Sequence, residues 1–243
     1  MKIILTAGCS FTKYKWPTWA NFISWFEPEH RIINLGAAGS SNETIQRSLY
    51  TGINKLKSVD KAFVMWSGTN RYEIVHDKID ENLKKDETVT YSRWNPDFEW
   101  NIFYGGHYFK DKHEYNIRWF QNERQNDVRM LERILFMQYY FEKNKIEYKM
   151  MCYKGHIIMH DKDKMSIGQR ALYDKIDWSR FIFYKDFGGL DDYTEEVWPD
   201  QYNKPEDLHP LPIAHYHWVR DIMYKIEHKV SENEYEKLKK WKI

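Results

Sequence analysis

Cysteine is scarce in this chain, and long apolar runs are missing. Only Cys9 and Cys152 occur among 243 residues, too few for a disulfide framework, which suits a reducing compartment. No run approaches the roughly 18 apolar residues of a membrane-spanning helix. The apolar start of the chain, residues 2–7, is also shorter than the core of a signal peptide, which has about 7–15 residues. We therefore expect a cytoplasmic protein without a membrane span.

An excess of charge of either sign is missing as well. The chain holds 37 basic and 36 acidic residues, which gives a formal net charge of +1. Nucleic-acid-binding domains usually carry a basic excess on one face, so we expect no nucleic-acid partner. The sequence also lacks Gly-x-Gly-x-x-Gly and Gly-Lys-Ser/Thr, the motifs that cradle phosphates in nucleotide-binding folds. A nucleotide cofactor is therefore not expected.

What the sequence does contain is an alternation of short apolar runs and helical periodicities. The apolar runs predict strands over residues 2–7, 31–35, 61–66, 147–153 and 180–184. Periodic segments predict helices over residues 16–26, 41–57, 122–143, 166–176 and 213–228, with a loop over 185–208. Alternating strands and helices are typical of a parallel sheet that helices cover. We therefore predict an α/β protein, a three-layer α/β/α sandwich, as one domain spanning residues 1–243.

Aromatic residues are abundant, at 17 % of the chain with 11 Trp and 18 Tyr. They are dense in residues 71–120, a polar stretch without clean periodicity after the third expected strand. This stretch is too long for an ordinary loop, so we predict an insertion that serves as a lid or binding element. Extra core and a subunit interface are the alternatives. Residues 231–243 predict a charged surface helix.

Small or polar residues follow three of the expected strands. Ser10 follows the first strand in Gly-Cys-Ser-Phe-Thr, Gly39 lies in the glycine turn after the second, and Asn70 follows the third in Gly-Thr-Asn. Because ligands of parallel sheets bind beyond the carboxyl ends of the strands, we expect these groups to share one edge. A hydroxyl nucleophile and N–H donors for a developing oxyanion are what acyl transfer needs.

A base and a carboxylate for such chemistry stand near the C-terminus. His209 follows Glu206 and Asp207 in a loop before the last core helix. A carboxylate that orients a histidine, which takes the serine proton, completes the logic of a catalytic triad. His215 and His217 are rival bases. With His209 they invite a metal interpretation, but helix positions two apart face different directions, so we predict no metal site.

Taken in order, these four segments resemble the motif blocks of the SGNH hydrolase superfamily, also called GDSL esterases. The resemblance implies a flavodoxin-like sheet. It also implies the site roles: Ser10 as nucleophile, Gly39 and Asn70 as oxyanion-hole donors, His209 as base and Asp207 as the orienting carboxylate, with Glu206 as the alternative. The last block is one residue shorter than the family's Asp-x-x-His-Pro, and we favour Asp207 because compact forms also look family-like.

Two positions depart from the family pattern, and several residues have simpler interpretations. Cys9 stands where the family usually has Asp, and Arg71 stands where Asp often follows the Asn. Ser10 alone could be a helix N-cap, and Asn70 could close a turn. Cys9 could itself be a nucleophile, although a buried cysteine usually behaves as a small hydrophobe.

The expected function is hydrolysis of an ester by a Ser-His-Asp mechanism, without a metal or organic cofactor. O-acetyl groups on a carbohydrate are the favoured substrate, since aromatic faces stack well on sugar rings. One alternative is an O-acyltransferase that uses the same site. The other is a non-enzymatic binding or virion-associated protein on the same fold, because the Lys-, Asn- and Tyr-rich composition suggests an AT-rich genome such as that of a phage or its host. The sequence does not indicate the oligomeric state.

Overall fold

Four parallel strands form the central sheet of the protein, here seen in a computed structural model that describes residues 2–56, 58–76, 89–92, 99–104, 123–204, 207–227 and 230–240. In sheet order they are β2 (His30–Asn34), β1 (Lys2–Ala7), β3 (Lys61–Trp66) and β7 (Glu147–Cys152). Both faces of such a sheet are covered, which explains why its strands are nearly continuous apolar runs. The predicted α/β class and parallel, flavodoxin-like strand order are confirmed.

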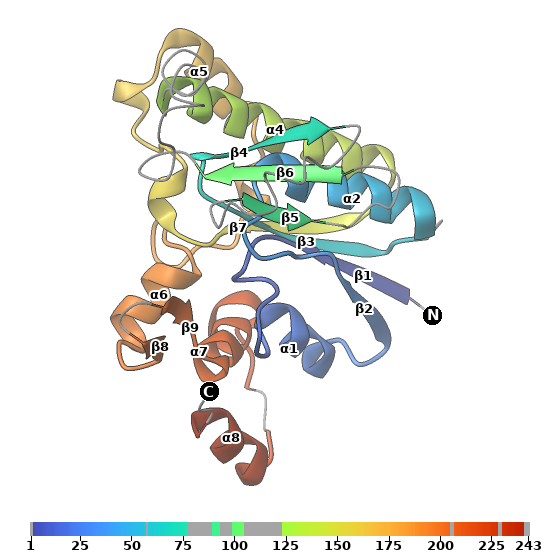
Figure 1. Ribbon diagram of the computed structural model, residues 1–243, viewed down its shortest axis with the longest axis vertical. Coiled ribbons are helices and arrows are strands. Elements are labelled where there is room, and N and C mark those ends of the chain that lie inside the picture. Colours follow the sequence, from blue (N-terminus) through green and yellow to red (C-terminus); the bar gives the residue numbers. More distant parts are fainter. Residues whose placement is uncertain are drawn as a thin grey trace.

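Helices cover both faces of this sheet, as Figure 1 shows. On one face α1 (Trp19–Phe26) and α7 (Pro212–His217) pack on side chains such as Ile4. On the other, α2 (Asn42–Leu56) and α4 (Glu123–Lys143) pack on side chains such as Leu5. Successive strand residues point to opposite faces, so each strand feeds two separate apolar cores. The predicted three-layer α/β/α arrangement is confirmed.

The structure corrects three of the expected boundaries and elements. Helix α1 begins at Trp19 rather than at residue 16, because Thr18 is extended and caps it. The expected fifth strand, 180–184, forms only a single parallel bridge, from Phe181 to Met150, and the chain then turns back at Tyr184. The expected loop 185–208 contains helix α6 (Leu190–Val197) and strand β8 (Tyr202–Lys204).

A second sheet follows β3 directly. It is antiparallel, in the order β4 (Arg71–His76), β6 (Glu99–Tyr104) and β5 (Val89–Ser92). These strands are the described parts of the predicted insertion 71–120, and its other residues lie outside the described ranges. Strand β4 runs beside α2, so this sheet begins at the carboxyl edge of the central one.

The C-terminal third completes the face that carries α1 and α7. A short hairpin pairs β8 with β9 (Asp207–Pro210), which leads into α7 and the π-helical segment η5 (Trp218–Tyr224). Helix α8 (Glu232–Lys239), capped by the Ser231 hydroxyl, buries Leu238 against this face. The other described elements are η2 (Gly155–Ile157), η3 (Lys162–Lys164), α5 (Ile167–Tyr173) and η4 (Trp178–Arg180).

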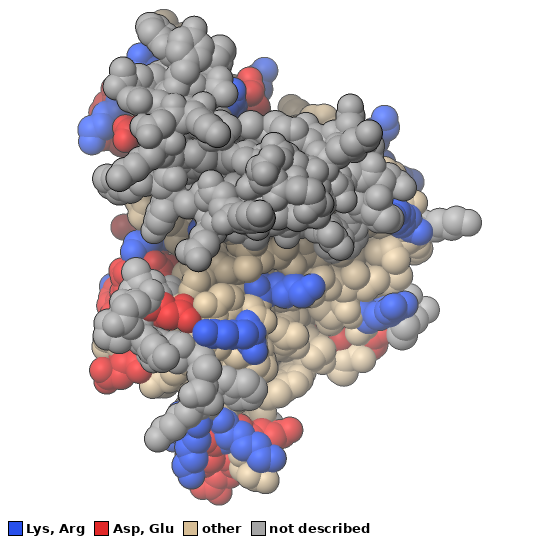
Figure 2. All heavy atoms as spheres, in the orientation of Figure 1, with Lys and Arg blue, Asp and Glu red and all other residues tan. Residues whose placement is uncertain are grey.

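Basic and acidic side chains are interspersed on the face drawn in Figure 2, among the residues coloured there. This mixture accords with the nearly balanced composition of 37 basic and 36 acidic residues. None of the helices in the described ranges is both long enough and apolar enough to span a membrane.

Candidate active site

The turn after β1 presents Ser10 at the carboxyl edge of the sheet. The Cys9 carbonyl accepts hydrogen bonds from the N–H groups of Thr12 and Lys13, at 2.9 and 3.2 Å, which closes a tight turn around the serine. Gly8 leads into this turn with no room for a side chain. A Cβ there would lie 2.0 Å from the Thr12 hydroxyl oxygen and 2.9 Å from the Met65 carbonyl oxygen. The backbone therefore fixes Ser10 tightly at this position.

Three residues from opposite ends of the sequence form a hydrogen-bonded chain here. The Ser10 hydroxyl oxygen lies 2.7 Å from His209 Nε2, and His209 Nδ1 lies 2.7 Å from Asp207 Oδ1. With Nδ1–H donating to the carboxylate, Nε2 is left to accept the serine proton. Of the two carboxylates considered, Asp207 contacts the imidazole, and Glu206 lies outside the described residues.

The surroundings of His209 favour the neutral form of its imidazole. The Tyr14 ring stacks on it with a centroid distance of 4.2 Å, and the Phe11 ring lies 5.2 Å away. Burial lowers the pKa of His209 below its ordinary value; the hydrogen bond to Asp207 raises the pKa, and the charge of Arg71 lowers it further. A neutral imidazole can act as a general base.

Two residues just after Ser10 donate hydrogen bonds to β9, the strand that carries His209. The Tyr14 hydroxyl donates to both carboxylate oxygens of Asp207, at 3.1 and 3.0 Å, and the Trp16 indole N–H donates to the Pro210 carbonyl at 2.9 Å. Burial and the neighbouring Asp207 raise the pKa of Tyr14 to about 12, so it stays a donor. Motif comparison missed both residues, because only the fold brings them to β9.

The glycine turn after β2 packs directly against the serine turn. The Ala37 N–H donates to the Gly8 carbonyl at 3.1 Å. The Asn34 side-chain amide donates to the Thr12 carbonyl and accepts from the Gly36 N–H, each at 2.9 Å. Gly39 has a φ of 80°, a conformation that favours glycine. The structure therefore places Gly39 in the turn after β2, whose Ala37 contacts the turn that carries Ser10.

The turn after β3 is held by the first residue of α2. The Asn42 amide donates to the Ser67 carbonyl at 3.0 Å and accepts from the Ser67 N–H at 2.8 Å. Asn70 follows with an exposed side chain. Arg71 donates to the Ser67 hydroxyl at 2.8 Å. The three predicted strand-end groups thus lie at one edge of the sheet, and Arg71 contributes a positive charge there.

His215 and His217, the two histidines considered as rival bases, have surroundings of their own. His215 is fully buried, and burial lowers its pKa to about 3. His217 lies 3.2 Å from the Asp221 carboxylate through Nδ1 and 2.9 Å from the Tyr235 hydroxyl through Nε2. His217 is thus held by Asp221 and Tyr235, whereas His209 contacts Asp207 and Ser10.

Elsewhere in the described ranges, three potential metal ligands lie close together at the start of β2. Atoms of Glu27, Glu29 and His30 lie within 4.8 Å of one another. Glu27 already accepts hydrogen bonds from the Lys61 ammonium at 2.7 Å and the Tyr224 hydroxyl at 3.1 Å. These contacts account for the cluster, which stands at the amino end of the strands, opposite the serine turn.

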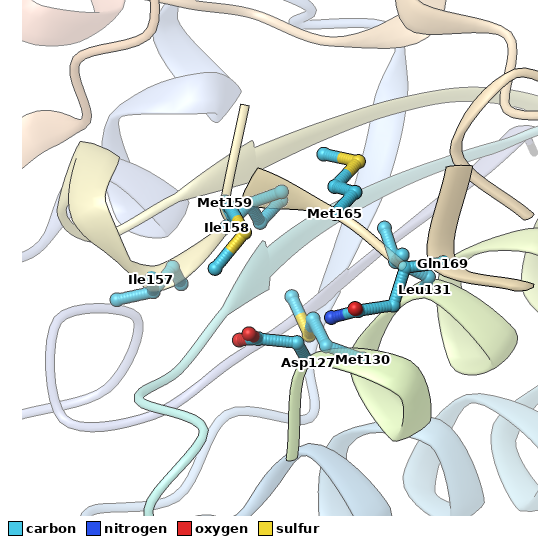
Figure 3. Close-up of a pocket in the computed structure, with 8 residues that line it drawn as sticks. All are labelled: Asp127, Met130, Leu131, Ile157, Ile158, Met159, Met165 and Gln169. Atoms are coloured by element: carbon cyan, nitrogen blue, oxygen red, sulfur yellow. The ribbon is translucent and has the colours of Figure 1, made fainter. Parts of the chain in front are cut away.

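Two pockets adjoin the first turns of α4 and share Met130 in their linings. One is polar and lies beside the turn after β3, with Thr69 and Arg71 in its wall. The other, drawn in Figure 3, is lined mainly by methionine and isoleucine side chains from α4 and from the segment after β7. Neither lining includes Ser10 or His209.

Comparison with known proteins finds similarity at the level of chain path alone. No family model matches the chain, and no curated protein sequence matches it. One similar solved structure is that of a proposed GDSL-like lipase from Parabacteroides merdae, at 12 % identity and a TM-score of 0.44, covering 90 % of this chain and 94 % of that one. Another is LAE5, an alpha/beta hydrolase enzyme from the metagenome of Lake Arreo, at 12 % identity and a TM-score of 0.46, covering 93 % and 97 %.

Proposed function

We propose that this protein is a serine ester hydrolase of the SGNH, or GDSL, type. The observation that carries the proposal is the continuous chain from Asp207 through His209 to Ser10, with both contacts at 2.7 Å. A nucleophile within hydrogen-bond reach of a base, itself oriented by a third group, is the arrangement that activates a serine hydroxyl. A helix N-cap or a turn residue has no need of such partners.

In the first half of the reaction, Ser10 attacks the ester carbonyl. Its Oγ forms a bond to the carbonyl carbon while His209 Nε2 takes the hydroxyl proton. The resulting oxyanion is stabilised by the backbone N–H groups of Ser10 and Gly39 and by the Asn70 side-chain amide. Collapse of this intermediate breaks the bond to the alcohol oxygen, which receives the proton from His209, and leaves an acyl group on Ser10.

In the second half, water removes the acyl group. His209 takes a proton from the water as its oxygen attacks the acyl carbon, and the same donors hold the second oxyanion. The bond to Ser10 Oγ then breaks, the serine oxygen regains a proton from His209, and a carboxylic acid leaves. In both halves of the reaction, Asp207 holds the imidazole in the tautomer that lets Nε2 accept and return the proton.

The proposed substrate is an O-acetyl group on a carbohydrate. Aromatic side chains gather beside the base: the rings of Phe11 and Tyr14 lie against His209, and the Tyr153 ring lies 5.1 Å from that of Phe11. Aromatic faces offer stacking surfaces of the kind that sugar rings use, and they combine an apolar body with polar groups for hydroxyls. Phe11 is buried, so the half-buried rings of Tyr14 and Tyr153 are the ones that support a carbohydrate alcohol.

Hydrolysis by the wild type and by Ser10→Ala, assayed side by side, tests this function. The substrates are 4-nitrophenyl esters from acetate to octanoate, together with O-acetylated oligosaccharides from which released acetate is measured. We expect turnover by the wild type and its loss in Ser10→Ala, with acetate the preferred acyl group. Equal rates for the two proteins would overturn the proposed site and favour a binding protein on this fold.

A further inference from the structure

Three arginines line the polar pocket beside the proposed catalytic edge. We call it the arginine pocket: it is a shallow, solvent-open hollow between α2, α4 and the turn after β3, lined chiefly by Asn42, Thr69, Arg71, Asn126, Arg129 and Arg133. Among the described residues of its lining, Glu43 is the acidic one, beside three arginines. The arginines give these described residues a basic character, which favours an anion.

This basic character is not used up by the ion pair inside the pocket. Arg133 pairs with Glu43 and also donates to the Arg129 carbonyl at 2.9 Å. Arg129 is half-buried, and its guanidinium makes no hydrogen bond or ion pair with any residue that the structure describes. Its planar fork of donors matches the two oxygens of a carboxylate, and Arg129 is therefore the group best placed to bind one.

Arg71 connects this pocket to the proposed reaction centre. It directly follows the oxyanion donor Asn70, and its guanidinium donates to the Ser40 carbonyl at 3.4 Å, one residue after Gly39. Its charge also reaches the base, since it contributes to lowering the pKa of His209. Arg71 thus belongs both to the arginine pocket and to the strand-end turns that carry Gly39 and Asn70.

The adjoining pocket of Figure 3 has the opposite character. Its wall is almost entirely apolar, and its only charged residue is Asp127, a carboxyl whose pKa burial raises. An anionic group would be desolvated there without a cation to pair with. The two pockets therefore suit different substituents of a substrate: the apolar pocket suits an uncharged group, and the arginine pocket suits a negatively charged one.

We infer that the arginine pocket is a subsite for an oxyanion group, a carboxylate or a phosphate, carried by the substrate near the scissile ester. This inference rests on the proposed function and narrows it: the preferred substrate is an acylated acidic carbohydrate, with a uronic acid as the simplest form. Arg129 and Arg71 bind the anionic group, and Asn126 supplies a further amide beside it.

The test compares two matched substrates in three proteins. The substrates are O-acetylated glucuronate and O-acetylated glucose, which differ by the carboxylate alone. The proteins are the wild type, Arg129→Gln and Arg124→Gln. Arg124 is an exposed arginine of the same helix outside the pocket, so the control makes the same charge change. We expect the wild type and Arg124→Gln to prefer the glucuronate ester by about tenfold or more in kcat/KM, and Arg129→Gln to lose most of that preference.

A binding measurement separates this inference from the proposed activity. Calorimetry with glucuronate and with inorganic phosphate, on the same three proteins, reads the subsite without any turnover, and the tighter ligand identifies the anionic group. Binding lost only in Arg129→Gln would support the subsite even if Ser10 proved inactive. Ser10-dependent hydrolysis without a carboxylate preference, together with equal anion binding by all three proteins, would overturn the subsite and leave the esterase standing.

Discussion

At the scale of single residues, Tyr14 links the proposed triad to the turn that carries Ser10. One side chain both stacks on the His209 ring and donates to the Asp207 carboxylate. The Lys15 ammonium also lies 3.3 Å from that carboxylate, but it is exposed, and exposed ion pairs contribute little. We therefore regard Tyr14 as a positioning residue for the base and its carboxylate.

Replacing Tyr14 with Phe keeps the stacked ring and removes the hydrogen bond. The loss of about 1 kcal/mol should lower kcat about fivefold with little change in KM. Asp207, no longer sharing its charge with the hydroxyl, should raise the pKa of His209, so the acid limb of the pH profile should move to higher pH. Tyr139→Phe, at an exposed position of α4, is the matched control. An unmoved pH profile in Tyr14→Phe would show that Tyr14 does not act on the base.

The pH dependence of the wild type follows from the lowered pKa of His209. Burial and Arg71 lower the pKa of the imidazole, so its protonation moves to a pH below the ordinary value of about 6.5. Because only the neutral base can take the serine proton, kcat/KM should fall off below that value rather than at or above it. A pH–rate profile from about pH 4 to pH 9 checks this, and an acid limb above about 6.5 would contradict it.

At the scale of elements, the proposed site depends on how three strand ends are held together. Turn-to-turn hydrogen bonds join the loops after β1 and β2 through Gly8, Ala37 and Asn34. The third loop, which carries Asn70, is joined instead through the first residue of α2: Asn42 satisfies both backbone groups of buried Ser67. The helix thus holds the loop that carries the proposed oxyanion donor, as well as covering the sheet.

Asn42→Ala should therefore affect both stability and activity. It leaves the buried N–H and C=O of Ser67 without partners, which should lower the free energy of unfolding by about 2–3 kcal/mol. It should also reduce kcat, because the Asn70 loop loses its support. Urea unfolding and ester hydrolysis measure the two effects. Asn54→Ala, at an exposed position of the same helix, should change neither, and a stable, fully active Asn42→Ala would refute the role given to this amide.

The elements that could be predicted are the strands that are buried on both faces of the sheet, because such burial gives a short apolar run in the sequence. Strands β1 and β3 have the expected bounds because a doubly covered strand is a short apolar run. Residues 180–184 have the same composition but form one bridge only. Helix α6 escaped prediction because its start is fixed by a distant contact: Asp192 accepts from the N–H groups of Gly189 and Gly155, at 2.7 and 2.6 Å.

Some residues of the candidate site could likewise be predicted from the sequence, and others could not. Ser10, His209 and Asp207 could be picked out because their neighbours in the sequence form recognisable motifs. Tyr14 could not, because its partner Asp207 lies 193 residues further along the chain. The arginine pocket was also hidden from sequence, since it joins Arg71 to residues of α4 across the 71–120 stretch. Contacts that the fold creates between distant segments leave no local pattern to read.

At the scale of the whole molecule, the two faces of the sheet differ in what they border: one borders the arginine pocket, and the other is covered by the C-terminal helix α8. The face with α2 and α4 borders the arginine pocket. The face with α1 and α7 is closed at its outer side by α8, where Leu238 is buried and the Tyr235 hydroxyl lies 2.9 Å from His217 Nε2. The last helix therefore contributes to stability at a distance from the proposed chemistry.

Leu238→Ala tests this division. Removing a buried leucine side chain should lower the free energy of unfolding by about 2–4 kcal/mol, while the folded protein should keep its kcat for 4-nitrophenyl acetate. Urea unfolding and the ester assay at a temperature well below the transition measure the two quantities. Lys237→Ala, exposed on the same helix, is the control. A large fall in kcat without a loss of stability would show that α8 acts on the site.

The central claim is that His209 activates the Ser10 hydroxyl as a nucleophile, and covalent labelling tests it most directly. A fluorophosphonate reacts with an activated serine as Oγ bonds to phosphorus and fluoride leaves, and peptide mass mapping locates the adduct. We predict one adduct on Ser10 in the wild type, none in Ser10→Ala, and labelling slowed by about a hundredfold or more in His209→Gln. Absence of the adduct from wild-type Ser10, or equal labelling rates in the wild type and His209→Gln, would contradict the account.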